Sequence, residues 1–222
     1  MPNSKTHQSL AVFDRNCTLC PRIAGHLQTV RKDYPDYYAR PVAPFGVENP
    51  DLLVVGLGPG MHGANATGRP FTGDYAGILL YRTLYDYGFS DSPESTHKDD
   101  GLKLKKCRIT NAVKCLPPEN KPTGEEVRTC NPYLRAELQA IKGRLVILAL
   151  GKIAHDAVLR ALDLKRKDYP FRHNAKYPLN GPQRWLVDSY HCSRYNTQTR
   201  RLTPAMFHKV FDNIHKILAI SN

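Results

Sequence analysis

The sequence contains no long hydrophobic run, no recognisable signal peptide and no internal repeat. No stretch reaches the roughly 18 apolar residues that a membrane-spanning helix needs, so we expect no membrane partner. The first ten residues are polar, which argues against secretion and favours a cytoplasmic protein. Without repeats or low-complexity tracts, residues 1–222 are expected to form a single domain with a sizeable core, present as a monomer.

Acidic side chains are scarce relative to basic ones. Lys and Arg total 32, whereas Asp and Glu total 20, which gives a formal net charge of +12 at pH 7. This excess favours a polyanionic partner, with nucleic acid as the first candidate. Basic loops at residues 103–108 and 165–167 are candidates for phosphate contacts, although exposed charge runs are commonly only solvated and some proteins are simply basic.

The sequence also lacks the lysine-containing phosphate loop of nucleotide-binding enzymes. The glycine-rich stretch at residues 56–74, GLGPGMHGANATGRPFTGD, contains no GxxxxGK[ST]. Its glycines let the backbone approach a ligand closely and adopt positive φ, while Pro59 and Pro70 stiffen it. Such a loop is usually built to hold a ligand, so we expect a binding site here and disfavour a nucleotide-binding enzyme.

Four short apolar or β-branched runs alternate with segments of helical spacing. Strands are expected at residues 52–56, 107–113, 144–150 and 184–188, each followed by a helix. The first and third are continuously apolar, as in strands that are covered on both faces. Right-handed crossovers then give an α/β fold, with a central four-stranded parallel sheet between helix layers. Ligands bind such sheets beyond the carboxyl ends of the strands.

Two pairs of cysteines suggest a metal centre. Cys17 and Cys20, in the N-terminal segment 1–50, have the spacing that lets two thiolates face one metal. A redox CxxC is the rival, but such a motif follows a strand, and this one precedes the first expected strand. With Cys115 and Cys130, four thiolates would suit tetrahedral zinc or an iron–sulfur cluster. Disulfides are the remaining alternative, and no secretory signal supports them.

Three polar side chains lie near the ends of expected strands and helices. His191 follows the last strand, where an imidazole can donate to an oxygen that gains negative charge; a structural histidine is the alternative. Asn111, in the second strand, has an amide that suits a pyrimidine edge, although asparagine alone more often forms a turn. Asp74 begins a helix and is either its cap or a holder of water. Cys107 is expected to be a buried thiol, and Cys192 is left open.

Ordered motifs along the chain resemble the uracil-DNA glycosylases of the iron–sulfur-containing type. GLGPGMHGAN at residues 56–65 and GRPFTGD at 68–74 resemble the first motif of that family. TNAVKCLPP at 110–118 resembles the second, and HCSRYNTQTRRLT at 191–203 resembles the last. The resemblance extends from about Cys17 to the C-terminus and implies a 4Fe–4S cluster as cofactor. Its ligands would be Cys17, Cys20, Cys115 and Cys130.

Within this superfamily the chain is similar to family 5 (UdgB). Relatives in family 4 carry Glu at the position of Leu57, and other branches carry Asp or Asn at the position of Gly58 to place the attacking water. Family 5 usually has Ala where Gly58 stands. The resemblance implies a monofunctional DNA repair glycosylase, acting in base excision repair. It would hydrolyse the N-glycosidic bond of uracil in DNA, and of other deaminated bases such as hypoxanthine, to leave an abasic site.

The resemblance also implies how this chemistry is shared among the matched residues. Phe71 would stack on the extruded base, Asn111 would hydrogen-bond its pairing edge, and His191 would stabilise negative charge on O2 of the departing uracil. His62 and Asp74 would hold water and polarise the sugar side. The nucleotide backbone would lie against three glycines, Gly56, Gly58 and Gly60.

The rival prediction is a nucleic-acid-binding protein of the same fold that has lost catalysis. Its best argument is the missing acid or amide at Leu57 and Gly58, without which water activation cannot dominate from the usual place. For the enzyme, we therefore expect the rate to come chiefly from stabilising the leaving base. The resemblance further implies that residues 193–198 enter the DNA where the base has left.

Overall fold

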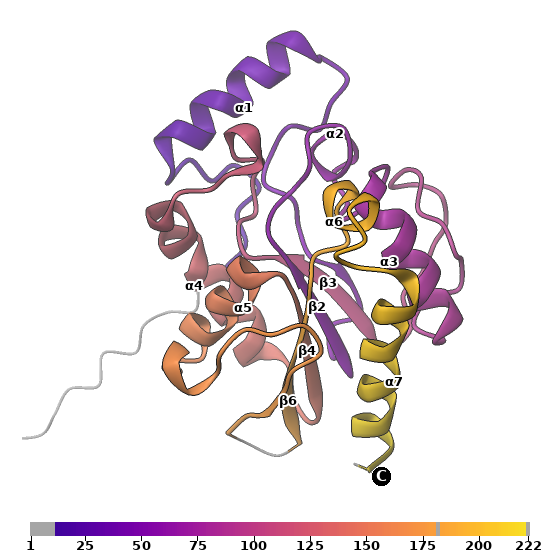
Figure 1. Cartoon of the computed structure of the whole chain (residues 1–222). Helices are drawn as coiled ribbons and strands as arrows, with labels where there is room; N and C mark the ends of the chain where they lie inside the picture. Colours follow the sequence, from indigo (N-terminus) through magenta and orange to yellow (C-terminus); the bar gives the residue numbers. More distant parts are fainter. Residues whose placement is uncertain (1–11, 181–182, 221–222) are drawn as a thin grey trace, which may run out of the picture.

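A six-stranded mixed sheet lies at the centre of the computed structural model, which describes residues 12–180 and 183–220 (Figure 1). Its strands are β1 Phe45–Gly46, β2 Leu52–Gly56, β3 Cys107–Asn111, β4 Leu145–Leu150, β5 Lys176–Pro178 and β6 Arg184–Ser189. They pair in the order β1-β3-β2-β4-β6-β5. The four inner strands are parallel to one another, and each edge strand runs antiparallel to its neighbour.

The expectation of a four-stranded parallel sheet is right for the centre and wrong at the edges. The edge strands β1 and β5 have two and three residues, too few to show an alternating pattern in the sequence. Gly46 of β1 lies against β3 at φ 120°, where a Cβ atom would collide with the Cys107 carbonyl oxygen. Pro178 is tolerated in β5 because an edge strand has a side without ladder hydrogen bonds.

Helices cover both faces of this sheet (Figure 1). They are α1 Pro21–Asp33, α2 Ala64–Thr67, α3 Tyr75–Asp86, α4 Gly124–Ala140, α5 Lys152–Ala161, α6 Arg194–Gln198 and α7 Pro204–Ile220, with short 3₁₀ turns at Pro118–Asn120 and Arg166–Asp168. The core side chains of α3 and α7 pack on one face, and those of α4 and α5 pack on the other. Within the described residues, no helix is long and apolar enough to cross a membrane.

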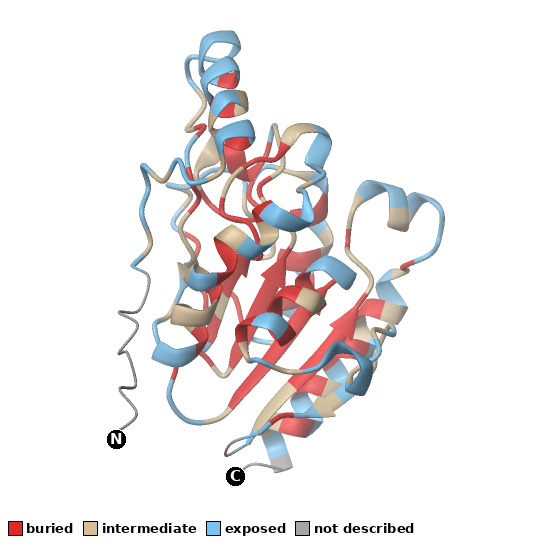
Figure 2. Cartoon of the chain, turned by 90° about the vertical axis from the view of Figure 1, so that its left-hand side faces the viewer, coloured by how far each residue is buried: buried red, intermediate tan, exposed pale blue. Residues whose placement is uncertain are grey.

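The alternating side chains of β2 connect both layers. Leu52 and Val54 belong to the core with α3 and α7, whereas Leu53 and Val55 belong to the core with α4 and α5. All four residues are fully buried, which is why the strand reads as one continuous apolar run. In Figure 2 the inner strands and the inward sides of the helices are accordingly coloured as buried.

The N-terminal segment forms a third, smaller core. α1 begins directly after Cys20, with Pro21 in the first turn, where the missing N–H of proline has no helical partner to lose. Its buried residues, including Ile23 and Leu27, pack against the chain after β3 and against Cys130 of α4. The polar stretch that argues against a signal peptide falls within residues 1–11, outside the described residues.

The connections place several loops at the carboxyl edge of the sheet. α3 leads from β2 to β3 over one face, and α5 leads from β4 to β6 over the other. The loops after β2 and β4 therefore diverge at this edge, and the chain after β6 ends beside them. Sheets of this kind bind ligands where such loops diverge.

A buried ion pair fixes the chain just beyond β3. Lys114 Nζ lies 2.5 Å from Glu137 Oε1 of α4, and the two side chains are 2% and 12% exposed. The same ammonium donates to Thr110 Oγ1 at 2.5 Å and to the Asn111 carbonyl oxygen at 3.0 Å. It therefore holds the end of β3, including the main chain of Asn111, against α4.

Replacing Lys114 with methionine should destabilise the protein by about 3–5 kcal/mol, because Glu137 would stay buried without its counter-charge. Combining Lys114→Met with Glu137→Leu should restore most of this loss, since neither charge then remains. Chemical denaturation followed by circular dichroism measures the free energy of unfolding. Lys121→Met is the control: its ion pair with Glu119 is exposed, so we expect a loss below about 1 kcal/mol. An equally small loss for Lys114→Met would contradict the prediction.

Candidate functional site

A pocket of about 510 Å³ opens at the carboxyl edge of the sheet, within the size range of small-molecule sites. Its walls are segments that follow the four inner strands, together with the first turns of α3, α5 and α6. Five of the expected catalytic and substrate-binding residues line it: Gly58, Gly60, Phe71, Asp74 and His191. The fold therefore brings together the first and last motifs, which lie far apart along the chain.

Phe71 lies in the pocket in a backbone conformation that L-residues rarely adopt. Its φ is 57°, and the residue is 5% exposed. The ring stacks on the His191 imidazole, with centroids 5.8 Å apart and planes inclined by 29°. The Phe71 carbonyl oxygen packs so closely on Gly77 that a Cβ atom there would collide with it. The first turn of α3 therefore needs a glycine to hold Phe71 in this position.

Asn111 ends β3 close to this ring. The residue is 3% exposed, and its Oδ1 atom has no hydrogen-bond partner among the described residues. A Cβ atom on Gly56 would lie 2.5 Å from that oxygen and 2.7 Å from Phe71 Cζ. The missing side chain of Gly56 thus lets the amide and the ring approach each other. Neither Gly56 nor Asn111 is part of the pocket lining itself.

His191 follows β6 and lines the pocket. Burial lowers the pKa of His191 to about 4, so its imidazole is neutral near pH 7 and carries one ring N–H. Asn196 of α6 donates from Nδ2 to the His191 carbonyl oxygen at 2.8 Å, which fixes the loop between them. Gly151 lies beside the histidine at φ 93°, a conformation that favours glycine and turns the chain tightly from β4 into α5.

Asp74 serves the helix and the pocket with different carboxylate oxygens. Oδ1 accepts a hydrogen bond from the Gly77 N–H at 2.9 Å, which confirms the expected cap of α3. Oδ2 faces the glycine-rich loop. A Cβ atom added to Gly60 would lie 3.3 Å from this oxygen, and one added to Gly63 would lie 2.6 Å from it. Burial raises the pKa of Asp74, and backbone N–H groups at the start of α3 partly offset this.

The structure holds His62 away from the pocket. Its side chain is exposed, and Nδ1 lies 2.8 Å from the Tyr37 hydroxyl. The ring also makes edge-to-face contacts with Tyr34 and Tyr37, which come from the segment after α1. A role for His62 in holding water stays a prediction, and this geometry does not support it.

Two features of the pocket could not be found from the sequence. Gly63 is one of several loop glycines, and only its position beside Asp74 explains why a side chain is excluded there. The Arg194 guanidinium of α6 lies over the Tyr75 ring of α3, 4.9 Å from its centroid, and both residues line the pocket. Contacts of this kind depend on the fold, because the two residues are distant in the sequence.

The four candidate metal ligands line one cavity next to α1, and all six cysteines of the chain are free thiols. Burial raises the pKa of Cys115, and charge on Cys130, Cys17 and Cys20 raises it further, so the four thiols are near enough to influence one another. Within the described part of the chain, no group of three or more His, Cys, Asp or Glu side chains is placed to hold a single metal ion.

Two of these sulfur atoms accept hydrogen bonds. The Lys114 N–H donates to Cys130 Sγ at 3.3 Å, and the Tyr133 hydroxyl donates to Cys17 Sγ at 3.5 Å. Donors of this kind are typical around metal-bound thiolates, where they orient the ligands and tune the metal. The chemistry of this donor set suits a thiolate-bound metal centre, whereas its arrangement among the described residues does not surround a single ion.

Comparisons with known proteins agree with the sequence motifs. The model of the uracil DNA glycosylase superfamily matches residues 43–215. The type-5 uracil-DNA glycosylase of Thermus thermophilus is 47% identical over 201 residues, 87% of this chain and 90% of the relative. The type-5 uracil-DNA glycosylase of Pyrobaculum aerophilum is 42% identical, over 85% of this chain and 83% of the relative. The type-4 enzyme of the same organism is 32% identical, over 83% and 81%. The chain belongs to the uracil DNA glycosylase superfamily, and within it to the type-5 uracil-DNA glycosylases.

Proposed function

We propose that this uracil-DNA glycosylase binds an extruded uracil or hypoxanthine in the pocket at the carboxyl edge of the sheet. The observation that carries this proposal is the buried Asn111 Oδ1 atom, which has no partner among the described residues. It lies outside the pocket lining but near the Phe71 ring, which belongs to that lining. A buried polar atom without a partner costs free energy unless a ligand satisfies it. The identity of 47% to a type-5 enzyme supports catalysis over the rival, an inactive nucleic-acid-binding protein.

The amide of Asn111 suits an edge that the two bases share. Uracil presents an oxygen on C4 beside the hydrogen on N3, and hypoxanthine presents an oxygen on C6 beside the hydrogen on N1. An amide can donate to that oxygen and accept from that hydrogen, whereas cytosine reverses the pattern. Phe71 offers a flat apolar surface on which either ring can stack. These two residues therefore support a range of deaminated bases rather than uracil alone.

His191 is the group that we assign to the departing base. Cleavage leaves negative charge on the base, shared with O2 of uracil, and a fixed donor aimed at that charge stabilises the transition state more than the ground state. Because burial lowers its pKa to about 4, the His191 imidazole is neutral near pH 7 and offers one ring N–H as a hydrogen-bond donor. A fixed donor of this kind contributes about 3–4 kcal/mol, or roughly a few hundredfold in rate.

Asp74 is the pocket carboxylate that we assign to the water and to the positive charge that develops on the sugar. Other branches have an acid or an amide at the positions of Leu57 and Gly58. In this chain, these two residues provide neither a carboxylate nor an amide side chain. A Cβ atom on Gly58 would have its nearest neighbour at 3.5 Å, so the alanine usual in family 5 would fit here without changing the chemistry. We therefore give Asp74 a secondary role, and stabilisation of the leaving base the main one.

The pocket also supports hydrolysis without strand cleavage. A lyase uses an amine to form a Schiff base with the sugar. Lys152 is the lysine found among the described residues that line the pocket. Its Nζ lies 2.8 Å from the Asp156 carboxylate, one turn further along α5. Water is therefore the nucleophile in this proposal, and the enzyme is monofunctional.

The proposal includes a 4Fe–4S cluster held by the four cysteines. Thiolates that bind one zinc ion have Zn–S distances of about 2.3 Å, so their sulfur atoms lie within about 4 Å of one another. Among the described residues, no three or more possible ligands are close enough together to bind one ion. A cluster spreads its ligands around several iron atoms and suits four thiols that line one cavity. When bound, it would act as a structural cross-link. Because Cys115 follows Asn111 by four residues, this cross-link would steady the chain that carries the base-reading amide.

DNA would approach the pocket from the side of α6. Arg194 lines the pocket, and Tyr195 beside it is 70% exposed, which supports the prediction that residues 193–198 enter the duplex. The basic segment at residues 103–108 runs into the first residues of β3 and so lies toward the amino edge of the sheet, away from the pocket. Their basic character does not support a contact with the same stretch of DNA.

His191→Ala should lower the single-turnover rate on every substrate, by roughly a few hundredfold, because the donor to the leaving base is lost. Asn111→Ala should instead change the preference between uracil and hypoxanthine. Asp74→Asn should have an intermediate effect, since asparagine keeps the helix cap. Labelled oligonucleotides carrying either base, treated with alkali to cleave abasic sites, measure the rates. If Asp74→Asn abolished activity and His191→Ala barely slowed it, Asp74 would be the principal catalyst.

The rate of base release should stay constant between about pH 6 and 8, because His191 is already neutral above its pKa of about 4. Acidification should slow the reaction with an apparent pKa above the ordinary aspartate value of about 3.9, because burial raises the pKa of Asp74 and the ionised form is the active one. Single-turnover rates with saturating enzyme measure this profile. Asp74→Asn should remove the part of the acid limb that lies above the His191 pKa of about 4. A transition centred near the ordinary histidine value of about 6.5 would argue against the assignment.

Anaerobically purified protein should be yellow-brown and contain about four iron atoms per chain. Cys115→Ser should lose iron and visible absorption together. Cys107→Ala should keep both, because Cys107 is a fully buried thiol of β3, as expected, and is not part of the cavity. Metal analysis and visible spectroscopy provide the measurements, and stoichiometric zinc without iron would refute the cluster.

A further inference from the structure

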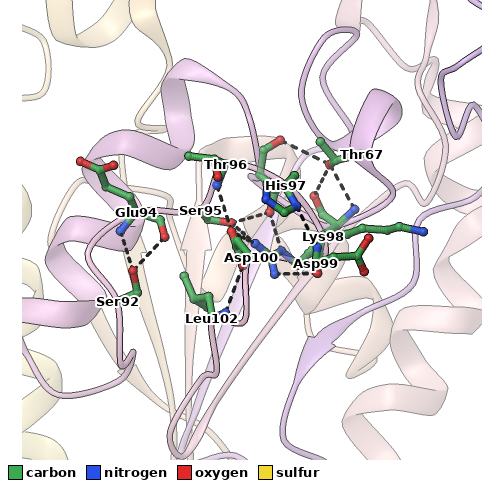
Figure 3. Close-up of polar contacts among 12 residues, drawn as sticks. Thr67, Ser92, Glu94, Ser95, Thr96, His97, Lys98, Asp99, Asp100 and Leu102 are labelled. Atoms are coloured by element: carbon green, nitrogen blue, oxygen red, sulfur yellow. Dashed lines mark hydrogen bonds and ion pairs between the residues drawn. The ribbon is translucent and has the colours of Figure 1, made fainter.

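We propose that Arg69 and Asp100 are positioning residues, which hold Phe71 in place for base stacking by tying its loop to residues 91–101. This inference rests on the stacking role proposed for Phe71. Residues 91–101 connect α3 to β3, and Asp100 and Arg69 are not among the residues that line the pocket. The link between the two segments is a polar network, part of which is shown in Figure 3.

The guanidinium of Arg69 is buried and donates to both segments. The residue is 5% exposed, and its Nε donates to Thr72 Oγ1 at 2.8 Å within its own loop. Its Nη2 donates to Ser95 Oγ at 2.6 Å and to Asp100 Oδ2 at 2.5 Å, and its Nη1 donates to the Lys98 carbonyl oxygen at 3.2 Å. Reaching four acceptors at once depends on the planar fork of arginine, which lysine lacks.

The Asp100 carboxylate accepts hydrogen bonds from two backbone N–H groups in addition to the Arg69 guanidinium. Its Oδ2 also accepts the Thr96 N–H at 3.0 Å, and its Oδ1 accepts the Leu102 N–H at 3.0 Å (Figure 3). Burial alone would raise the pKa of the carboxyl, but hydrogen bonds from Arg69 and Leu102 lower it to about 2. The carboxylate is therefore ionised throughout the working range, and the ion pair does not switch with pH.

Phe71 lies between the anchor points of this network. Arg69 precedes it by two residues, Thr72 follows it directly, and Thr72 Oγ1 lies 2.7 Å from Ser95 Oγ. The Gly73 N–H then donates to the Ser95 carbonyl oxygen at 3.1 Å. A phenylalanine at φ 57° is in a costly conformation, which persists only where the surroundings hold it. Anchors on both sides supply that restraint, so loss of the ion pair should release the ring from its stacking position.

The experiment compares the affinity of the protein for two DNA duplexes. One carries the non-hydrolysable nucleotide 2′-fluoro-deoxyuridine, and the other carries a tetrahydrofuran abasic analogue at the same position. Phe71 contacts the base and nothing that an abasic site retains. A residue that acts through Phe71 therefore affects the first duplex alone, whereas a merely structural ion pair affects both or neither.

Asp100→Asn and Arg69→Lys should each weaken binding to the uracil duplex by about tenfold, the size of a lost base–aromatic contact, and leave binding to the abasic duplex unchanged. Ser95→Ala removes one contact and should shift the same affinity in the same direction by less, which keeps the test decisive if Asp100→Asn fails to fold. Asp91→Asn is the matched control. Asp91 lies in the same segment, but its Oδ1 accepts the Lys103 N–H at 2.8 Å, and its replacement should change neither affinity.

Phe71→Ala separates this inference from the proposed function. If Phe71→Ala leaves the affinity for the uracil duplex unchanged, the stacking role itself is wrong. If Phe71→Ala weakens that affinity and the Arg69 and Asp100 variants do not, or weaken both duplexes equally, the positioning role is overturned. Adding Asp100→Asn to Phe71→Ala should cause no further loss, because both act through one ring.

Discussion

Helices cover both faces of the central sheet, and this burial decides where the rest of the molecule can act. Alternate side chains of β2 and β4 pack against different helix pairs, so neither face is open to a ligand. The inner strands end together only at the carboxyl edge, where their register is fixed by the parallel ladder. Loops at that edge are therefore held by the strands beneath them, which allows irregular, glycine-rich backbone to keep a defined shape.

Burial acts on the chemistry of the pocket as well as on its position. It lowers the pKa of His191 and raises that of Asp74, so in both groups it favours the uncharged form. A neutral base can therefore approach His191 without desolvating an imidazolium ion. When charge then develops on the departing base, the low dielectric strengthens its interaction with a fixed N–H donor. The same burial that weakens acid–base chemistry thus favours stabilisation of the leaving group.

β2 and β4 could be predicted because strands buried on both faces read as continuous apolar runs, and β3 and β6 from short apolar or β-branched runs. β1 and β5 are too short for any pattern. In the site, His191 could be predicted because a motif places it after a strand. His62 shows the limit of that reasoning, since the motif is present but Tyr37, from a distant segment, holds the side chain elsewhere. Arg69 shows the converse, because its partner Asp100 lies 31 residues away and only the fold reveals the pair.

The edges of the sheet have a consequence for the protein in solution. β1 has two residues, and Pro178 of β5 cannot donate a hydrogen bond to any further strand. Sheets with long, regular edges invite a second copy to add its own strand, a route to fibres that natural proteins block with short or proline-containing edges. A protein that must search long DNA for rare lesions has to remain dispersed while it does so. The short edge strands β1 and β5 therefore prevent a further strand from pairing with the sheet.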